Sequence, residues 1–135
     1  MRGRSPYDQN GRLILEEGYL VYECNRMCRC NKSCPNRVLQ NGVRVKLEVF
    51  KTEKKGWAVR AGEAILRGTF VCEYIGEVLD VQEAHNRRER YDTTNSSYFY
   101  DINARVNDMS RLIEEQVQYV IDATKNGNVS RFINH

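Results

Sequence analysis

Apolar and polar residues alternate most regularly between residues 43 and 49. Valine or leucine occupies every odd position from Val43 to Val49, and charged residues occupy the even positions. A period of two is typical of a strand with one buried and one solvated face, so this segment is predicted to be a strand. A turn at Lys54-Lys55-Gly56 then leads into a second predicted strand at Trp57 to Arg60.

Three later segments are also predicted to be strands. Thr69 to Ile75 is dense in residues with high strand propensity, and Tyr98 to Ile102 and Tyr119 to Asp122 are shorter segments of the same kind. Gly76, after the first of them, indicates a bulge or a close approach of another backbone. The dipeptide Asn126-Gly127 is typical of a tight turn.

One helix is predicted between these strands. Asp80 and Glu83 have the spacing of a capping box, and Gln82 to Arg90 contains good helix formers. Charged residues surround this helix, so it is expected to project from the body rather than to enter a core. Residues 109–116 are ambiguous, with apolar residues at helical spacing. The fold class is therefore predicted to be mainly β, made of short strands, with a small α component.

Composition limits the possible size and partners. The 135 residues suffice for one domain or a piece of one, and a hydrophobic content of 41% supports a modest core. No apolar run approaches the roughly 20 residues that a membrane span needs, so no membrane partner is expected. The net charge of +3 does not indicate nucleic acid. The basic clusters at 51–55 and 87–90 are interpreted as solvated faces, and direct nucleic-acid binding is not expected.

Four closely spaced cysteines predict a zinc site: Cys24, Cys28, Cys30 and Cys34. Zinc is bound tetrahedrally by thiolates from short, sharply turning segments. A disulfide cluster is the alternative, but the chain has five cysteines, an odd number, and no apolar signal stretch at its N-terminus. This cysteine usage indicates a reducing compartment, the cytosol or the nucleus. Cys72, on a predicted strand, is expected to be a core thiol rather than a ligand.

Several stretches resemble one protein family in the same order. Residues 128–135 read Asn-Val-Ser-Arg-Phe-Ile-Asn-His and resemble the central motif of the SET-domain protein lysine methyltransferases. The cysteine run resembles the end of the pre-SET zinc region. Three further stretches resemble the first cofactor motif, the strand before the inserted region and the substrate-facing strand: Lys55-Gly56-Trp57, Glu73-Tyr74-Ile75-Gly76-Glu77 and Ser97-Tyr98-Phe99-Tyr100-Asp101.

The resemblance extends from about Tyr7 to His135. It points to the subgroup that methylates lysine nine of histone H3, particularly the plant members related to the suppressors of variegation. It implies the C-terminal part of a pre-SET zinc region at 1–41, followed at 42–135 by an incomplete SET domain with a β-clip-like fold. It also implies transfer of a methyl group from S-adenosylmethionine to a lysine of the histone H3 tail, in chromatin of the nucleus.

The resemblance assigns residues to the cofactor. Backbone groups of Lys55 and Trp57 correspond to those that hold the methionine part, and Gly56 lets the chain approach closely. Tyr98 corresponds to another cofactor contact, and Arg131 to a polar neighbour. Asn134 and His135 correspond to the pair that holds the adenosine side. Taken singly, Trp57 would be interpreted as a core aromatic and His135 as a surface residue.

The resemblance also assigns residues to the target lysine. Tyr74 corresponds to a catalytic channel tyrosine whose hydroxyl bonds the amine, and Tyr100 to an aromatic channel wall. Asp101 lies on the strand against which the histone peptide pairs. Burial in such a channel disfavours the ammonium and lowers the lysine pKa, which the attack requires. As single residues these would be ordinary strand positions.

The chain also departs from the family pattern. Ala58 replaces a second glycine, and Tyr100 stands where phenylalanine is frequent, which leaves the number of methyl groups added open. The region 103–116 is longer than in many relatives. The remaining zinc ligands and a catalytic tyrosine would lie outside this sequence, so the chain is expected to be an inactive fragment of a methyltransferase. The alternatives are a catalytically silent, zinc-containing chromatin-interaction module and a small zinc module that binds nucleic acid.

Overall fold

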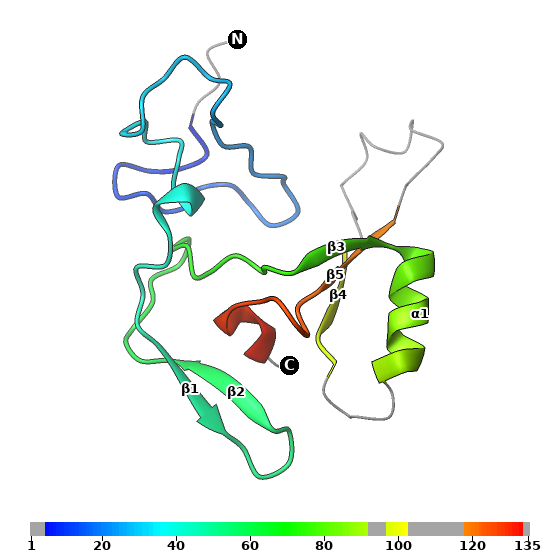
Figure 1. Ribbon diagram of the computed structural model, residues 1–135. Coiled ribbons are helices and arrows are strands. Elements are labelled where there is room, and N and C mark those ends of the chain that lie inside the picture. Colours follow the sequence, from blue (N-terminus) through cyan, green and yellow to red (C-terminus); the bar gives the residue numbers. More distant parts are fainter. Residues whose placement is uncertain (1–4, 92–96, 103–117, 134–135) are drawn as a thin grey trace. The chain divides into compact units, whose positions relative to one another are not determined.

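The computed structural model describes residues 5–91, 97–102 and 118–133. The chain divides into two compact units, traced by sequence colour in Figure 1. The first comprises residues 1–48 and 60–72, and the second comprises residues 49–59 and 73–135. Within the described part of the chain, no helix is both long and apolar enough to cross a membrane.

The first unit contains little regular structure and is held by hydrogen bonds between loops. Tyr7 and Leu13 form an isolated antiparallel bridge. The backbone N–H of Leu13 donates to the carbonyl of Gly68 at 2.7 Å. The short 3-10 helix η1 (Leu39–Asn41) follows the cysteine loop. These contacts bring the beginning of the unit against its last segment.

The carboxylate of Glu23 organises the chain around the cysteines. It accepts hydrogen bonds from the Tyr7 hydroxyl at 2.7 Å and from the backbone N–H groups of Val38 and Leu39 at 2.9 and 2.8 Å. Burial would raise the pKa of Glu23, but these hydrogen bonds outweigh it and hold the pKa below its usual value. One ionised carboxylate therefore ties both ends of the cysteine loop together.

Strands β1 (Leu47–Lys51) and β2 (Trp57–Ala61) form a two-stranded sheet. The turn between them is closed by Thr52, whose backbone N–H donates to the carbonyl of Gly56 at 2.7 Å. Gly56 has φ of +70°, a left-handed conformation that glycine adopts without strain. The predicted turn at 54–56 is therefore confirmed.

Three strands of the second unit form an antiparallel sheet in the order β3-β5-β4. They are β3 (Glu77–Asp80), β4 (Phe99–Ile102) and β5 (Tyr119–Asp122). The register places Leu79 opposite Val120 and Phe99 opposite Asp122. The strands predicted at 98–102 and 119–122 are confirmed, and β5 is the central strand.

Helix α1 (Val81–Tyr91) follows β3 directly. The side chain of Asp80 caps it by accepting from the backbone N–H of Glu83 at 2.8 Å. Ala84 is fully buried in a cluster with Leu79 and Val120, against which Phe99 packs. The expectation that this helix projects from the body is therefore wrong. The helix is charged over most of its surface but buries one small residue, Ala84, and the number of charged positions in the sequence does not indicate this.

Two strand predictions also need correction. Residues 69–75 are not a strand, and the ladder begins at Glu77, opposite Asp122. High β-propensity produces an extended chain, but a strand also needs a hydrogen-bonding partner, and the carbonyl of Glu73 is taken by the Asn128 side chain instead. In the alternating segment the strand begins at Leu47 rather than Val43. The ambiguous region 109–116 lies outside the described residues. The mainly β fold class with one helix is confirmed.

Gly76 is predicted to be essential for the sheet of the second unit. A Cβ atom at this position would lie 2.5 Å from the carbonyl oxygen of Asp122, which is backbone and cannot rotate away. We expect Gly76→Ala to lower the free energy of unfolding by about 1–3 kcal/mol, the usual cost of overpacking, measured by urea unfolding. Gly62→Ala is the control, because the nearest atoms there belong to the flexible side chains of Lys46 and Glu48. Equal losses in the two variants would contradict the prediction.

Candidate functional site

Three of the four predicted metal ligands lie together in the first unit. The Sγ atoms of Cys24, Cys30 and Cys34 all lie within 4.8 Å of one another. Cys28 is exposed and stands outside this group, with its Sγ 3.8 Å from the Asn25 side-chain oxygen. Three converging thiols with an exposed fourth thiol on the same loop are a donor set that fits tetrahedral zinc.

Two asparagine turns shape the loop that carries these cysteines. The side-chain oxygen of Asn25 accepts from the backbone N–H of Met27 at 2.9 Å, and that of Asn31 accepts from Ser33 at 3.1 Å. Such side-chain-to-backbone bonds replace a backbone turn. They reverse the chain twice and let thiols from positions 24, 30 and 34 converge.

Arg37 provides positive charge beside the thiols. It is buried, and its guanidinium donates to Cys30 Sγ at 3.2 Å and to the carbonyl of Asn25 at 2.8 Å. The bond from Arg37 lowers the pKa of Cys30. The Asn36 amide favours the thiolate of Cys24, but hydrogen bonds with Cys30 and Cys34 together with burial raise its pKa to about 11. Arg37 thus favours the thiolate form of Cys30, one of the three converging thiols.

Cys72 lies apart from the other cysteines. It is half-buried, and burial raises the pKa of its thiol. It does not belong to the group of converging Sγ atoms. Its interpretation as a core thiol rather than a ligand stays a prediction.

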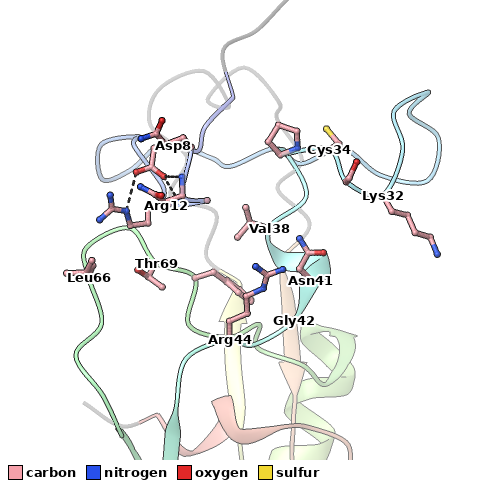
Figure 2. Close-up of a pocket in the computed structure, with 16 residues that line it drawn as sticks. Asp8, Arg12, Lys32, Cys34, Val38, Asn41, Gly42, Arg44, Leu66 and Thr69 are labelled. Carbon is pink, nitrogen blue, oxygen red and sulfur yellow. Dashed lines mark hydrogen bonds and ion pairs between the residues drawn. The ribbon is translucent and has the colours of Figure 1, made fainter.

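A cavity of about 810 Å³ opens in the first unit, next to the metal-binding loop. Figure 2 shows Asp8 and Arg12 joined across one side of it, with their ion pair at 3.2 Å. Arg44 and Cys34 also line this cavity, whereas none of the residues assigned to cofactor or lysine does. This cavity is therefore not where the sequence predicts the methyl-transfer chemistry.

The tyrosines assigned to the target lysine lie together in the second unit. The rings of Tyr74 and Tyr100 are 5.1 Å apart between centroids, tilted by 34°. Tyr74 is half-buried, and burial raises the pKa of its hydroxyl, assisted by the negative charge of Asp122 and opposed by Arg131. The Tyr74 hydroxyl therefore stays protonated at neutral pH. The structure therefore brings Tyr74 and Tyr100 together, and their assignment to a lysine channel stays a prediction.

Arg131 lies on the short 3-10 helix η3 (Val129–Phe132) and contacts the aromatic residues beside it. Its guanidinium stands over the rings of Tyr98 and Phe132, at 5.5 and 4.9 Å from their centroids. One terminal nitrogen donates to the carbonyl of Ala123 at 3.3 Å. The buried Nε has no hydrogen-bond partner among the described residues. An unpartnered buried donor is costly, so this atom marks a place for an external acceptor.

The side chain of Asn128 connects the motif that begins at residue 128 with the motif at residues 73–77. Its side-chain oxygen caps η3 by accepting from the backbone N–H of Ser130 at 3.0 Å, and its amide nitrogen donates to the carbonyl of Glu73 at 3.0 Å. Residues 55 positions apart in the sequence are therefore adjacent beside Tyr74. Asn134 and His135, the adenosine pair assigned from the sequence, lie outside the described residues.

Lys55, Gly56 and Trp57 lie at the turn and at the start of β2, within the second unit. The backbone N–H of Lys55 donates to the Thr52 hydroxyl at 2.9 Å. Trp57 is 50% exposed, which argues against its interpretation as a core aromatic. The left-handed Gly56 leaves its backbone open, because no atom lies within 4 Å of where a Cβ would stand.

Strand β4 carries Tyr100 and Asp101 at an edge of the sheet. Among the described residues β4 pairs with β5 alone, so its other edge has no described strand beside it. The carboxylate of Asp101 forms an ion pair with Arg88 of α1 at 2.6 Å, and Arg88 also stands over the Phe99 ring. The predicted solvated face at 87–90 thus contains a contact to the strand assigned to the peptide.

Sequence reasoning missed the polar residues that support the site. Arg37 beside the thiols was not identified, and neither was the ion pair between Arg87 of α1 and the buried Asp122 of β5. Asp122 ends a predicted strand and Arg87 lies in a charged run, so neither carries a recognisable local signal.

Comparisons with known proteins identify the family of this chain. The family model described as SET domain matches residues 56–135, and the model described as Pre-SET motif matches residues 1–37. Histone-lysine N-methyltransferase SUVR5 of Arabidopsis thaliana is 65% identical over the whole chain, which covers 10% of that protein. The H3 lysine-9 specific histone-lysine N-methyltransferase of Schizosaccharomyces pombe is 40% identical over 96% of this chain and 25% of its own length.

A solved structure extends the agreement to the fold. The crystal structure of Arabidopsis thaliana SUVH6 in complex with SAM matches with a TM-score of 0.76 and 41% identity, covering 98% of this chain and 28% of that one. The chain therefore spans a tenth to about a quarter of the length of the relatives that it matches.

The converging thiols generate a prediction about metal content. We expect about one zinc per chain by metal analysis, and loss of that zinc in Cys24→Ser, Cys30→Ser and Cys34→Ser. Cys28→Ser tests whether the exposed thiol is the fourth ligand and should weaken binding. Removal of the metal with a chelator should unfold the cysteine loop, because binding and folding are coupled. Cys72→Ser is the control; a zinc-free parent, or zinc loss in Cys72→Ser alone, would contradict the assignment.

Proposed function

We propose that this chain, which belongs to the SET-domain family, forms part of a histone-lysine N-methyltransferase and there binds S-adenosylmethionine and the target lysine. One observation carries the proposal: the side chain of Asn128 bonds the carbonyl of Glu73 and so places the 128–133 motif beside the Tyr74–Tyr100 pair. The names of the relatives, all histone-lysine N-methyltransferases, support the reaction class.

The described residues fit the cofactor. Gly56 lets a ligand approach its backbone closely, Trp57 offers an exposed ring, and the buried Nε of Arg131 offers a donor that has no acceptor among the described residues. We assign Lys55, Gly56, Trp57, Tyr98 and Arg131 to S-adenosylmethionine, together with Asn134 and His135, which lie outside the described residues. When bound, the cofactor supplies an electrophilic sulfonium methyl group.

The residues of this chain then prepare the nucleophile. The lysine amine must be neutral, and enclosure between Tyr74 and Tyr100 disfavours its ammonium form. The oxygen of the Tyr74 hydroxyl accepts a hydrogen bond from an amine N–H, which leaves the nitrogen lone pair free to point at the methyl group. Alignment of this kind supplies a large part of the acceleration in an in-line displacement.

The substrate is a histone H3 tail, which we place along β4. A peptide can add to this edge as a further strand, with its lysine directed between the tyrosines. Asp101 contributes an exposed carboxylate on the same strand, already held by Arg88. We place the protein in chromatin of the nucleus on this basis, with the pre-SET part at 1–41 holding zinc and the SET part at 42–135 holding cofactor and peptide.

The activity is tested in a chimera of Arabidopsis SUVR5 in which the matching segment is replaced by this chain, called the SUVR5 chimera below. We expect it to transfer methyl groups from labelled S-adenosylmethionine to an H3 tail peptide, and not to a peptide in which lysine nine is arginine. A chimera that binds cofactor and H3 peptide without transferring to any histone would instead support the silent interaction module.

Tyr74 and Asn134 should separate chemistry from cofactor binding. Tyr74→Phe keeps the ring and removes one hydrogen bond, worth on the order of 1 kcal/mol. In the SUVR5 chimera it should lower kcat about fivefold or change the number of methyl groups added, with an unchanged Kd for S-adenosylmethionine. Asn134→Ala should raise that Kd. Calorimetric titration of both variants decides, and the reverse pattern would show that the two assignments are wrong.

A further inference from the structure

The carboxylate of Asp122 is buried at the end of the central strand β5. The residue is 1% exposed. Its Oδ1 accepts from the backbone N–H of Thr124 at 2.9 Å, and its Oδ2 accepts from Arg87 at 3.0 Å and from the Tyr91 hydroxyl at 3.4 Å. Burial would raise the pKa of Asp122, but the bonds from Thr124 and Arg87 outweigh it and hold the pKa below its usual value. The group is therefore a buried anion at neutral pH.

Arg87 connects this anion to helix α1 and strand β3. Its Nε bonds Glu83 at 2.9 Å within the helix, and the nitrogen that bonds Asp122 also contacts Glu77. Its side chain is only 19% exposed, unlike that of Arg90, which is 66% exposed and bonds Glu83 alone among the acidic groups of the described residues. A planar guanidinium can serve several carboxylates in fixed directions. The pair therefore sets the position of β5 relative to the helix.

The two residues after Asp122 hold the backbone of Tyr98 directly. The Thr124 hydroxyl accepts from the backbone N–H of Tyr98 at 3.0 Å, and the backbone N–H of Ala123 donates to the Tyr98 carbonyl at 2.8 Å. The Ala123 carbonyl accepts from Arg131 at 3.3 Å. Tyr98 and Arg131, two of the residues assigned to the cofactor, are thus bonded to residues 123–124, which directly follow Asp122.

The backbone of the segment around Asp122 and Ala123 packs closely against two glycines. A Cβ at Gly76 would lie 2.5 Å from the Asp122 carbonyl oxygen, and one at Gly127 would lie 2.9 Å from that of Ala123. The ring of Tyr98 packs edge-on against Phe132 at 5.7 Å. We therefore expect a shift of the Asp122 backbone to move Tyr98 and Arg131 as well.

We propose that Arg87 and Asp122 form a positioning pair for the cofactor site, acting through Ala123 and Thr124 on Tyr98 and Arg131. The inference rests on the proposed function, since it names what holds that site in place. Neither member is assigned to cofactor or substrate. The charged helix α1, which the sequence suggested would project into solvent, instead contributes Arg87 to this positioning pair.

The test compares charge-removing variants in the SUVR5 chimera. Asp122→Asn and Arg87→Gln each leave a polar partner unmatched, and each should raise the Kd for S-adenosylmethionine about tenfold, which corresponds to about 1.4 kcal/mol. The double variant restores a neutral hydrogen-bonded pair and should lose less than the product of the two single effects. Arg90→Gln, on the same helix, is the matched control and should leave Kd unchanged.

A second pair of variants tests the connection while leaving both charged groups in place, although Thr124→Val also removes the hydrogen bond between the Thr124 side chain and Asp122. Thr124→Val removes the acceptor for the Tyr98 N–H and should also raise the Kd, whereas Thr124→Ser keeps the hydroxyl and should preserve it. If either charge variant fails to fold, the comparison of Thr124→Val with Thr124→Ser tests the positioning role instead.

All measurements are made below the unfolding temperature of each variant, which is determined separately. Single variants with a lowered Tm but the parent's Kd, together with an unchanged Thr124→Val, would show that the pair acts on stability only and would overturn the inference. A parent chimera that does not bind S-adenosylmethionine would instead reject the proposed function, and the positioning role with it.

Discussion

The ion pair between the buried carboxylate of Asp122 and the partly exposed guanidinium of Arg87 is the interaction on which the second unit depends. The apolar cluster around Ala84 is small, and three short strands bury few large side chains. A buried anion without its cation is strongly destabilising, so helix, sheet and carboxylate must assemble together. Because β5 is central, this one pair determines where both neighbouring strands lie, and hence where the aromatic residues of the site stand.

The first unit is also stabilised by charged residues rather than by a large apolar core, but the charges are arranged differently. It has almost no regular structure, and its loops are held by the carboxylate of Glu23 and the guanidinium of Arg37. Arg37 lowers the pKa of Cys30, while the proximity of the thiols to one another raises that of Cys24. Such a site is prepared for a metal ion but gains its full stability only with the cation. Small units with modest cores commonly use a structural metal in this way.

Both units therefore place ionised groups where a larger protein would place apolar side chains. In each, one charged residue is bonded to several segments that are distant in sequence. This arrangement makes the position of the functional groups sensitive to a few polar residues, and it leaves much apolar surface exposed. Tyr22, Met27 and Trp57 are examples, with exposed fractions of 74%, 85% and 50%.

Local pattern in the sequence determined the elements and the chemistry. The sequence allowed four features to be predicted, because each depends on residues close together in the chain: the capping residue Asp80, the turn before Trp57, the strand at 119–122 and the cysteine spacing.

Ordered motifs identified the family, but tertiary structure decided which groups meet. The failed strand at 69–75, the buried side of α1 and the pairing of Arg87 with Asp122 all depend on partners far away in the sequence. Propensity and periodicity describe one segment at a time, whereas a hydrogen-bond ladder or a buried ion pair exists only when two segments come together.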